Sequence, residues 1–230
     1  MGIRDGIPIC IGYLAVSFAF GITAVKIGLS IWEVVLISMF NLTSAGQVAG
    51  APIIAGGGSF VELALTQLTI NSRYSLMSVS LSQRLSGSVR MRDRFIVSFA
   101  NTDEVFAISM SKGTMLGRMY LYGLVLPPFF GWTLGTLLGA VLGSVLPVII
   151  ISSLGVAIYA MFIAIVVPPM KMHLKTALAV FSAIALSCVF YYTPVLKEIS
   201  SGFVIVICTV TISALFALIA PIPDVEEEAE

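Results

Sequence analysis

The stretch MYLYGLVLPPFFGWTLGTLLGAVLGSVLPVIIISSLGVAIYAMFIAIVVPPM, residues 119–170, decides the fold class. Its 52 residues include no Asp, Glu, Lys, Arg or His. About 20 apolar residues cross a bilayer, so this run alone has room for two crossings. The 230-residue chain is 58% hydrophobic and only 10% charged, whereas soluble domains are about 25% charged. We therefore predict a single-domain, all-α, polytopic integral membrane protein over residues 1–230.

Outward from this run, the hydropathy pattern predicts a helix bundle of about seven to eight membrane segments. They cover residues 8–28, 34–54, 61–83, 95–111, 119–142, 145–168, 176–196 and 202–220. Two segments look interrupted. Segment 34–54 is rich in polar residues and glycine, and segment 95–111 is short and acidic. We predict that both are broken or re-entrant helices, which membranes tolerate only where the backbone is buried or lines a cavity.

Basic residues indicate the orientation of the chain, because Lys and Arg accumulate in cytoplasmic loops. Three turns carry them, with Arg84, Arg90, Arg92 and Arg94 in the first, Lys112 and Arg118 in the second, and Lys171 and Lys175 in the third. If segment 95–111 does not cross, all three turns face the cytoplasm. If it crosses, the later two fall outside. The charges therefore favour a re-entrant acidic segment in a multi-pass protein of the plasma membrane, of the bacterial inner-membrane kind.

Composition also argues against several function classes. The net charge is zero, so the chain has no global basic face for nucleic acid. It contains neither GxxxxGK[ST] nor GxSxG, and its single histidine cannot build HExxH or a Ser-His pair. We expect no enzymatic activity, no cofactor and no metal. The acidic end, residues 224–230, is predicted to be a disordered tail.

The main functional signal is the triplet Thr102-Asp103-Glu104 inside an apolar segment. Each charge at the bilayer centre costs about 2.5–3.5 kcal/mol on insertion scales. Arg73, in the middle of segment 61–83, either binds a substrate carboxylate, holds an acid such as Asp103, or forms a purely structural ion pair. Adjacent helical residues point about 100° apart, so we expect one acid to meet Arg73 and the other to meet substrate or a proton. The alternative is an interfacial helix with a solvated acidic face.

Further polar residues complete the predicted substrate-binding site. The full set is Asn41, Thr43, Ser44, Gln47, Asn71, Arg73, Thr102, Asp103 and Glu104. The spacing from Asn41 to Gln47 is near-helical, so these side chains either face one cavity or bond one helix to another. Met77, Phe106 and Met110 are candidates for an apolar pocket lining.

Two patterns concern packing and internal symmetry. Gly135, Gly139 and Gly143 form GxxxGxxxG, which predicts close helix packing, and we interpret Trp132 as a packing or interfacial aromatic. The stretch Phe40-Asn-Leu-Thr43 resembles Phe99-Ala-Asn-Thr102. Repeats with broken helices at corresponding places are typical of secondary transporters; chance similarity is the alternative.

Several of these stretches also resemble a known family. They are Phe20-Gly21, Gly28-Leu29-Ser30, Ser44-Ala45-Gly46-Gln47, Asn71-x-Arg73, Thr102-Asp103-Glu104-x-Phe106 and Gly131-Trp132-x-x-Gly135-Thr136-x-x-Gly139. In this order they resemble the AzlC-like branched-chain amino acid permeases. The family often has glycine where this chain has Ser44, and histidine where it has Tyr74. The resemblance implies export of branched-chain or other large neutral amino acids, together with a small AzlD-like membrane partner.

The residues and the resemblance together favour a proton-coupled secondary transporter in the lipid bilayer, with a neutral amino acid as substrate. One rival is a channel or passive pore in which the polar cluster is a selectivity ring. A second rival is a subunit that mainly scaffolds its partner through the glycine seam.

Overall fold

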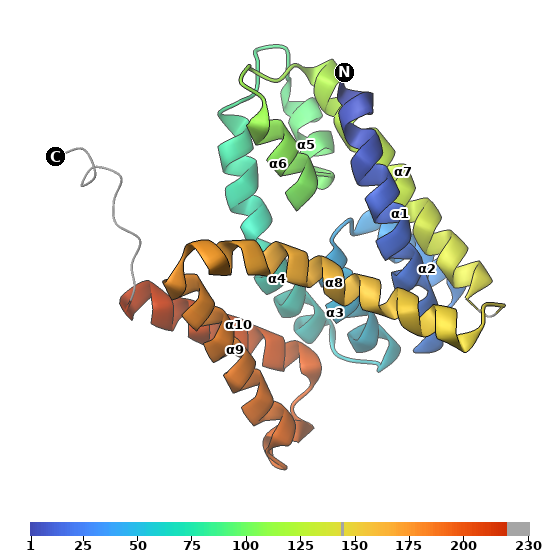
Figure 1. Cartoon of the computed structure of the whole chain (residues 1–230), viewed down its shortest axis with the longest axis vertical. Helices are drawn as coiled ribbons and strands as arrows, with labels where there is room; N and C mark the ends of the chain where they lie inside the picture. The colour runs from blue at the N-terminus through green and yellow to red at the C-terminus, as the bar shows by residue number, and fades with distance from the viewer. Residues whose placement is uncertain (144, 220–230) are drawn as a thin grey trace.

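The computed structural model describes residues 1–143 and 145–219, and within them the regular structure is helical (Figure 1). The elements are α1 (Gly2–Lys26), α2 (Ile31–Phe40), α3 (Ser44–Ala55), α4 (Phe60–Ser82), α5 (Met91–Phe99), α6 (Asp103–Ser111), α7 (Arg118–Leu142), α8 (Val148–Met172), α9 (Leu174–Tyr192), the 3-10 turn η1 (Leu196–Glu198) and α10 (Ser201–Ile219). The predicted all-α fold is thus confirmed. The acidic end at 224–230, for which we predicted disorder, lies outside the described residues.

Each of the eight predicted segments is helical, and the two that looked interrupted are the two that break. Segment 34–54 divides into α2 and α3, and segment 95–111 divides into α5 and α6. Among the described residues, four helices are both long and apolar enough to cross a bilayer, namely α1, α7, α9 and α10. A lipid-exposed break would leave backbone N–H and C=O groups unpaired in hydrocarbon, so both breaks must be buried in protein or face a cavity.

Helices α1 and α7 lie side by side and run parallel, and glycines bring their backbones close together (Figure 1). A Cβ atom on Gly131 would lie 2.6 Å from the carbonyl oxygen of Cys10, and one on Gly6 would lie 2.6 Å from that of Leu124. Gly139 likewise packs against the backbone of Phe18. The predicted close packing is confirmed, but its partner is α1 of the same chain. The glycine seam is therefore filled within the chain, contrary to the scaffold alternative.

The start of α7 lies beside the basic loop, and we call this end of the molecule the arginine end. The Ser86 N–H donates to the Leu116 carbonyl at 3.0 Å, and the Leu116 N–H donates to the Arg84 carbonyl at 2.8 Å. The Arg118 N–H donates to the Ser88 hydroxyl at 3.4 Å. The loop after α4 and the loop after α6 are therefore joined at one end of the molecule.

This junction shows that α5 and α6 form a re-entrant hairpin. The chain enters from the arginine end along α5, breaks at residues 100–102 and returns along α6 to the same end. There the Lys112 ammonium lies 2.8 Å from the Asp5 carboxylate in the first turn of α1. The acidic segment does not cross, as the charge pattern predicted, and the first two basic turns share one end.

Helices α2 and α3 form a second hairpin that enters from the opposite end. A short turn joins α2 to the end of α1, and another joins α3 to the start of α4. The Gln67 side chain, in the first half of α4, donates to the Gly46 carbonyl in the first turn of α3 at 2.7 Å. The break at residues 41–43 therefore lies inside the bundle, where it meets the tip of the other hairpin.

The two hairpins belong to an inverted repeat of about 59 residues. The long helices α1, α4 and α7 begin at Gly2, Phe60 and Arg118, at intervals of 58 residues. Helix α1 leaves the arginine end and α4 returns to it, and each is followed by a hairpin. Thr43 and Thr102, which end the two similar stretches, precede α3 and α6 as N-caps. The sequence similarity therefore marks equivalent places in the two units.

The remaining helices attach to one flank of this core. Glu62 in the first turn of α4 is buried, with 5% of its surface exposed. Its carboxylate accepts hydrogen bonds from the Ser200 hydroxyl and, at 3.2 Å, from the Gly202 N–H. This contact fastens the start of α10 to α4, while α8 passes beside α1 (Figure 1).

Substitution of Gly139 by leucine tests the seam. We expect Gly139→Leu to lower the free energy of unfolding by about 3 kcal/mol, the upper end for overpacked sites, because the new side chain meets backbone and not a flexible neighbour. Gly12→Leu is the matched control on α1, since a Cβ there meets nothing within 4 Å. Thermal melting of both variants in detergent measures the difference. Equal melting temperatures would contradict the packing described here.

Candidate functional site

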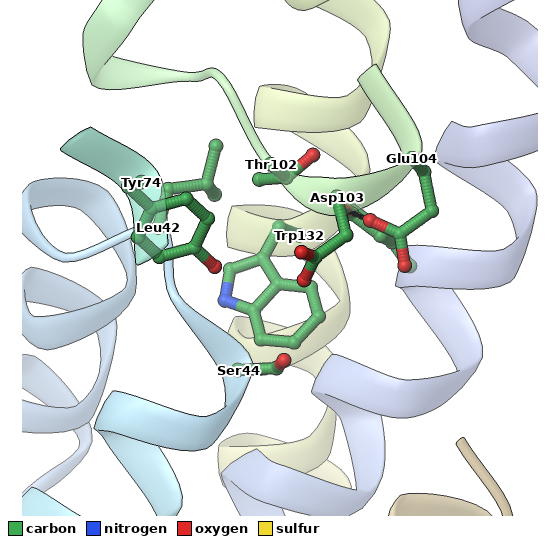
Figure 2. Close-up of a pocket in the computed structure, with 8 residues that line it drawn as sticks. Leu42, Ser44, Tyr74, Thr102, Asp103, Glu104 and Trp132 are labelled. Atoms are coloured by element: carbon green, nitrogen blue, oxygen red, sulfur yellow. Dashed lines mark hydrogen bonds between the residues drawn. The ribbon is translucent and has the colours of Figure 1, made fainter. Parts of the chain in front are cut away.

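The tips of the two hairpins meet at a small pocket in the middle of the bundle (Figure 2). Its cavity volume is about 10 Å³, roughly the space of one water molecule, and it is lined by Tyr13, Leu42, Ser44, Tyr74, Thr102, Asp103, Glu104 and Trp132. In Figure 2 the two carboxylates hang from the start of α6, and the Trp132 indole lies between them and the side of the pocket formed by Leu42 and Tyr74. The lining comes from both hairpins and from all three long helices of the repeat.

An ion pair links one long helix to one hairpin tip. The Arg73 guanidinium of α4 lies 2.7 Å from the Asp103 carboxylate of α6, with 35% and 29% of the two side chains exposed. Arg73 also donates to the Tyr74 hydroxyl at 3.2 Å, and its guanidinium carbon lies 4.8 Å from the centre of the Tyr74 ring. Among the partners proposed for Arg73, the one that it contacts here is Asp103.

The second acid has a different partner. Glu104 accepts a hydrogen bond from the Tyr13 hydroxyl of α1, and in the described part of the chain it forms no ion pair. The Tyr13 ring stands edge-on to Trp132, with 5.0 Å between ring centres. The two adjacent acids thus face different groups, as their positions on a helix predict. Arg73 balances Asp103, so Glu104 is the site's uncompensated negative charge.

Both hairpins present the start of a helix to the pocket. Ser44 begins α3 and Asp103 begins α6. The first N–H groups of a helix have no partner within it, and they carry the positive end of the helix dipole. The Thr43 side chain satisfies one of them by accepting from the Gly46 N–H at 3.0 Å. The pocket therefore combines acidic side chains with backbone groups suited to an anion.

Gln47 has a structural position next to the pocket and does not line it. Its side chain accepts from the Trp132 indole N–H at 2.7 Å and donates to the Ser38 hydroxyl at 2.8 Å. Ser38 in turn lies 2.7 Å from the Thr136 hydroxyl. All four side chains are at most 2% exposed. This network fixes the orientation of Trp132, which is a buried wall of the pocket and not the interfacial aromatic of the alternative reading.

Asn41 and Asn71 form a second network with Gln67, a residue that the sequence did not single out. The Gln67 carbonyl oxygen accepts from Asn41 at 3.3 Å and from Asn71 at 3.1 Å. The Asn41 contact bonds the first hairpin to α4, whereas the Asn71 contact lies within α4. The expectation that Asn41 and Gln47 share one helical face is wrong, because the chain breaks between them at residues 41–43.

Of the nine predicted site residues, four line the pocket, namely Ser44, Thr102, Asp103 and Glu104. Arg73 contacts it through Asp103, and Thr43 caps the helix beside it. The pocket lining does not include Met77, Phe106 or Met110. The aromatic residues Tyr13 and Tyr74 were missed, because an aromatic in an apolar helix carries no signal of its own in the sequence. In the part of the chain that the structure describes, no three His, Cys, Asp or Glu side chains are placed to hold a metal ion.

Comparison with known proteins identifies the family of the chain. The family model described as AzlC protein matches residues 8–146, which include both hairpins and α7. The chain belongs to the AzlC family. It is 30% identical over 141 residues to the Inner membrane protein YgaZ of Escherichia coli K12, an alignment that covers 60% of this chain and 58% of that protein. It is also 30% identical over 181 residues to an uncharacterized membrane protein of Archaeoglobus fulgidus, covering 77% and 79% of the two chains. No solved structure matches.

These relatives and the apolar helices make this AzlC-family chain a multi-pass membrane protein. The matched region is the inverted-repeat core, whereas α8 to α10 lie almost wholly beyond it. The pocket therefore lies within the part of the fold that defines the family.

A double-mutant cycle tests the network behind the pocket. Gln47→Leu leaves the buried Trp132 N–H without a partner and removes one of the two bonds of the Ser38 hydroxyl, so we expect a loss of about 2 kcal/mol in stability. Trp132→Phe removes the donor and leaves the Gln47 oxygen unpaired. The double variant should lose less than the sum by about 1 kcal/mol or more, because the groups share one hydrogen bond. Additive losses in thermal melting would show that the bond contributes nothing.

Proposed function

We propose that this protein is a secondary transporter that exports branched-chain or other large neutral amino acids, with the pocket as its substrate site. The observation that carries the proposal is the pair of re-entrant hairpins whose tips meet at an acidic, aromatic pocket. Inverted repeats with discontinuous helices at their interface are the architecture of many secondary transporters. Membership of a family associated with amino-acid transport supports the same conclusion.

A zwitterion with an apolar side chain suits the charges of the pocket. Its carboxylate is assigned to the start of α3 at Ser44, where backbone N–H groups favour an anion. Its ammonium is assigned to the acidic side, next to Glu104 and the ring faces of Tyr13 and Tyr74. Leu42 and Trp132 supply apolar surface for the side chain. Arg73 holds Asp103 in place. When this ion pair separates, the Arg73 guanidinium becomes available to bind the substrate carboxylate.

Glu104 is the residue to which we assign the coupling proton. Asp103 is neutralised by Arg73, so its charge stays balanced without a proton. Glu104 has only the Tyr13 hydroxyl, and a carboxylate that lacks a cation in a low-dielectric site is suited to bind and release a proton. Protonation of Glu104 would remove the uncompensated charge that attracts the substrate ammonium, which links proton and substrate.

The two hairpins provide a means of alternating access. One tip enters from each end of the molecule and each closes one side of the pocket. Movement of the α5–α6 hairpin opens the pocket towards the arginine end, which we place in the cytoplasm by its basic residues. Movement of the α2–α3 hairpin opens the opposite side. A small AzlD-like membrane subunit is the proposed partner, on the basis of the family resemblance.

Flux measurements in proteoliposomes test the proposal. Radiolabelled leucine, isoleucine, valine and methionine are followed with this chain alone and with a candidate small partner, under an imposed pH gradient. We expect saturable flux with counterflow that accelerates with the gradient. A conductance without saturation would instead identify a channel, and the absence of flux from correctly inserted protein in both preparations would reject these substrates.

Variants of the three charged residues separate their roles. Glu104→Gln should bind substrate more weakly, because the charge assigned to the ammonium is gone, and its flux should be equal with and without the pH gradient. Arg73→Ala should reduce flux at least about tenfold, because it leaves Asp103 unpaired in a partly buried site. Glu198→Gln, a change in an exposed acid far along the chain, is the control and should transport normally. A Glu104→Gln protein that still follows the gradient would remove Glu104 from the coupling step.

A further inference from the structure

We propose that the groove between α4 and α5 is a binding site for an anionic phospholipid, whose phosphate lies at Arg94 and whose acyl chain lies along the hairpin. The groove has a volume of about 280 Å³ and is distinct from the central pocket. Leu81 and Val97 form its buried floor, and Val79, Met91 and Phe95 form its walls. The inference rests on the membrane placement of the chain and not on the proposed substrate.

The surface of the groove is mainly apolar, although three serines line it. The Ser82 hydroxyl donates to the Val79 carbonyl at 2.6 Å, and the Ser98 hydroxyl donates to the Phe95 carbonyl at 3.0 Å. At the inner end, the Asn101 amide donates to the Ser78 hydroxyl at 3.4 Å. These three donors are engaged within the protein, whereas the buried side-chain oxygen of Asn101, at the inner end of the groove, has no partner among the described residues. What remains along the groove is hydrocarbon surface, which suits an acyl chain and not a polar solute.

The length and direction of the groove match one leaflet of a bilayer. Its lining extends from Met91 at the start of α5 to Asn101 at the hairpin tip. The nine residues of α5 rise about 14 Å, close to half of the roughly 30 Å hydrocarbon core. The outer end lies at the arginine end, where lipid headgroups are, and the inner end reaches mid-membrane. A lipid of that leaflet therefore fits with its head at Arg94.

Charge selects the class of lipid. Arg94 lines the groove, and Arg84 and Arg90 adjoin the lining residues Leu85 and Met91 in the sequence. These three arginines are exposed, and in the described part of the chain none of them forms an ion pair. Basic pockets between membrane helices on the cytoplasmic side bind anionic headgroups.

The acid in this loop does not neutralise the arginines of the groove. Asp93 accepts from the Tyr122 hydroxyl at 2.6 Å and from the Arg90 backbone N–H at 2.8 Å. The same two hydrogen bonds hold the pKa of Asp93 below its usual value. Its only ion-pair contact among the described residues is with Arg92, at 4.0 Å. The rim of the groove is therefore left with a positive charge that an anionic lipid can match.

Such a lipid would act on the transport site through α5. This helix is one arm of the hairpin whose tip carries Asp103 and Glu104. A lipid acyl chain packed against α5 would therefore change how readily that tip moves. The groove thus offers a way for membrane composition to regulate the site.

Lipid titration of the delipidated full-length protein, followed by native mass spectrometry in detergent, tests the proposal. Dioleoyl phosphatidylglycerol and dioleoyl phosphatidylcholine are compared because they share acyl chains and differ in charge. We expect the anionic lipid to bind at least about fivefold more tightly. Arg94→Gln should weaken it about fivefold, the effect expected for one basic side chain at a membrane surface. Lys171→Gln, which removes an equal charge in the last turn of α8, should change nothing.

Variants that fill the groove with a large side chain distinguish binding in the groove from nonspecific lipid contact elsewhere on the surface. Ser98→Trp and Val79→Trp, one on each wall, should each abolish one bound anionic lipid, whereas Leu68→Trp on an exposed part of α4 should not. Two filling variants are used because loss of binding in one alone could result from misfolding. Equal binding of the two lipids, or unchanged binding in both filled variants, overturns the proposal. Tight binding of glycerol 3-phosphate alone also overturns it, because that result would identify a phosphate site without an acyl chain.

Discussion

Two breaks in the backbone, at residues 41–43 and 100–102, impose the constraint on which the rest of the structure depends. Each break leaves N–H and C=O groups that helical bonding does not satisfy, and in hydrocarbon each such group costs several kcal/mol. The fold meets this cost by placing both breaks inside the bundle, tip to tip, and by capping α3 with Thr43. The same polar groups that must be buried for stability are thereby available to a ligand.

The three long helices of the repeat hold this arrangement in place. Glycine contacts lock α1 against α7, and Tyr13 and Trp132 from these helices meet at the pocket. Helix α4 contributes Arg73, whose pairing with Asp103 fixes the second tip. Corresponding parts of α1, α4 and α7 thus supply one wall each. The inverted repeat explains why residues so far apart in the sequence converge on a single site.

The charges of the site and of the arginine end have different roles. At the pocket, Arg73 pairs with Asp103, and Glu104 accepts a hydrogen bond from the Tyr13 hydroxyl. At the arginine end, exposed basic side chains outnumber the acids and face the membrane surface. The α5–α6 hairpin connects the two regions, since it begins among the arginines and ends at the acids.

The sequence by itself determined the all-α membrane fold and the places of both breaks, and it put an acid of the adjacent pair among the possible partners of Arg73. These follow from hydropathy, from polar residues within apolar segments and from the cost of an unpaired charge. Only the tertiary structure decided which acid that is, and it separated Gln47, Asn41 and Asn71 from the pocket. It also brought Tyr13 and Tyr74 into the site. Those outcomes depend on contacts between helices that are distant in the sequence, and local sequence patterns do not specify which helices pack against each other.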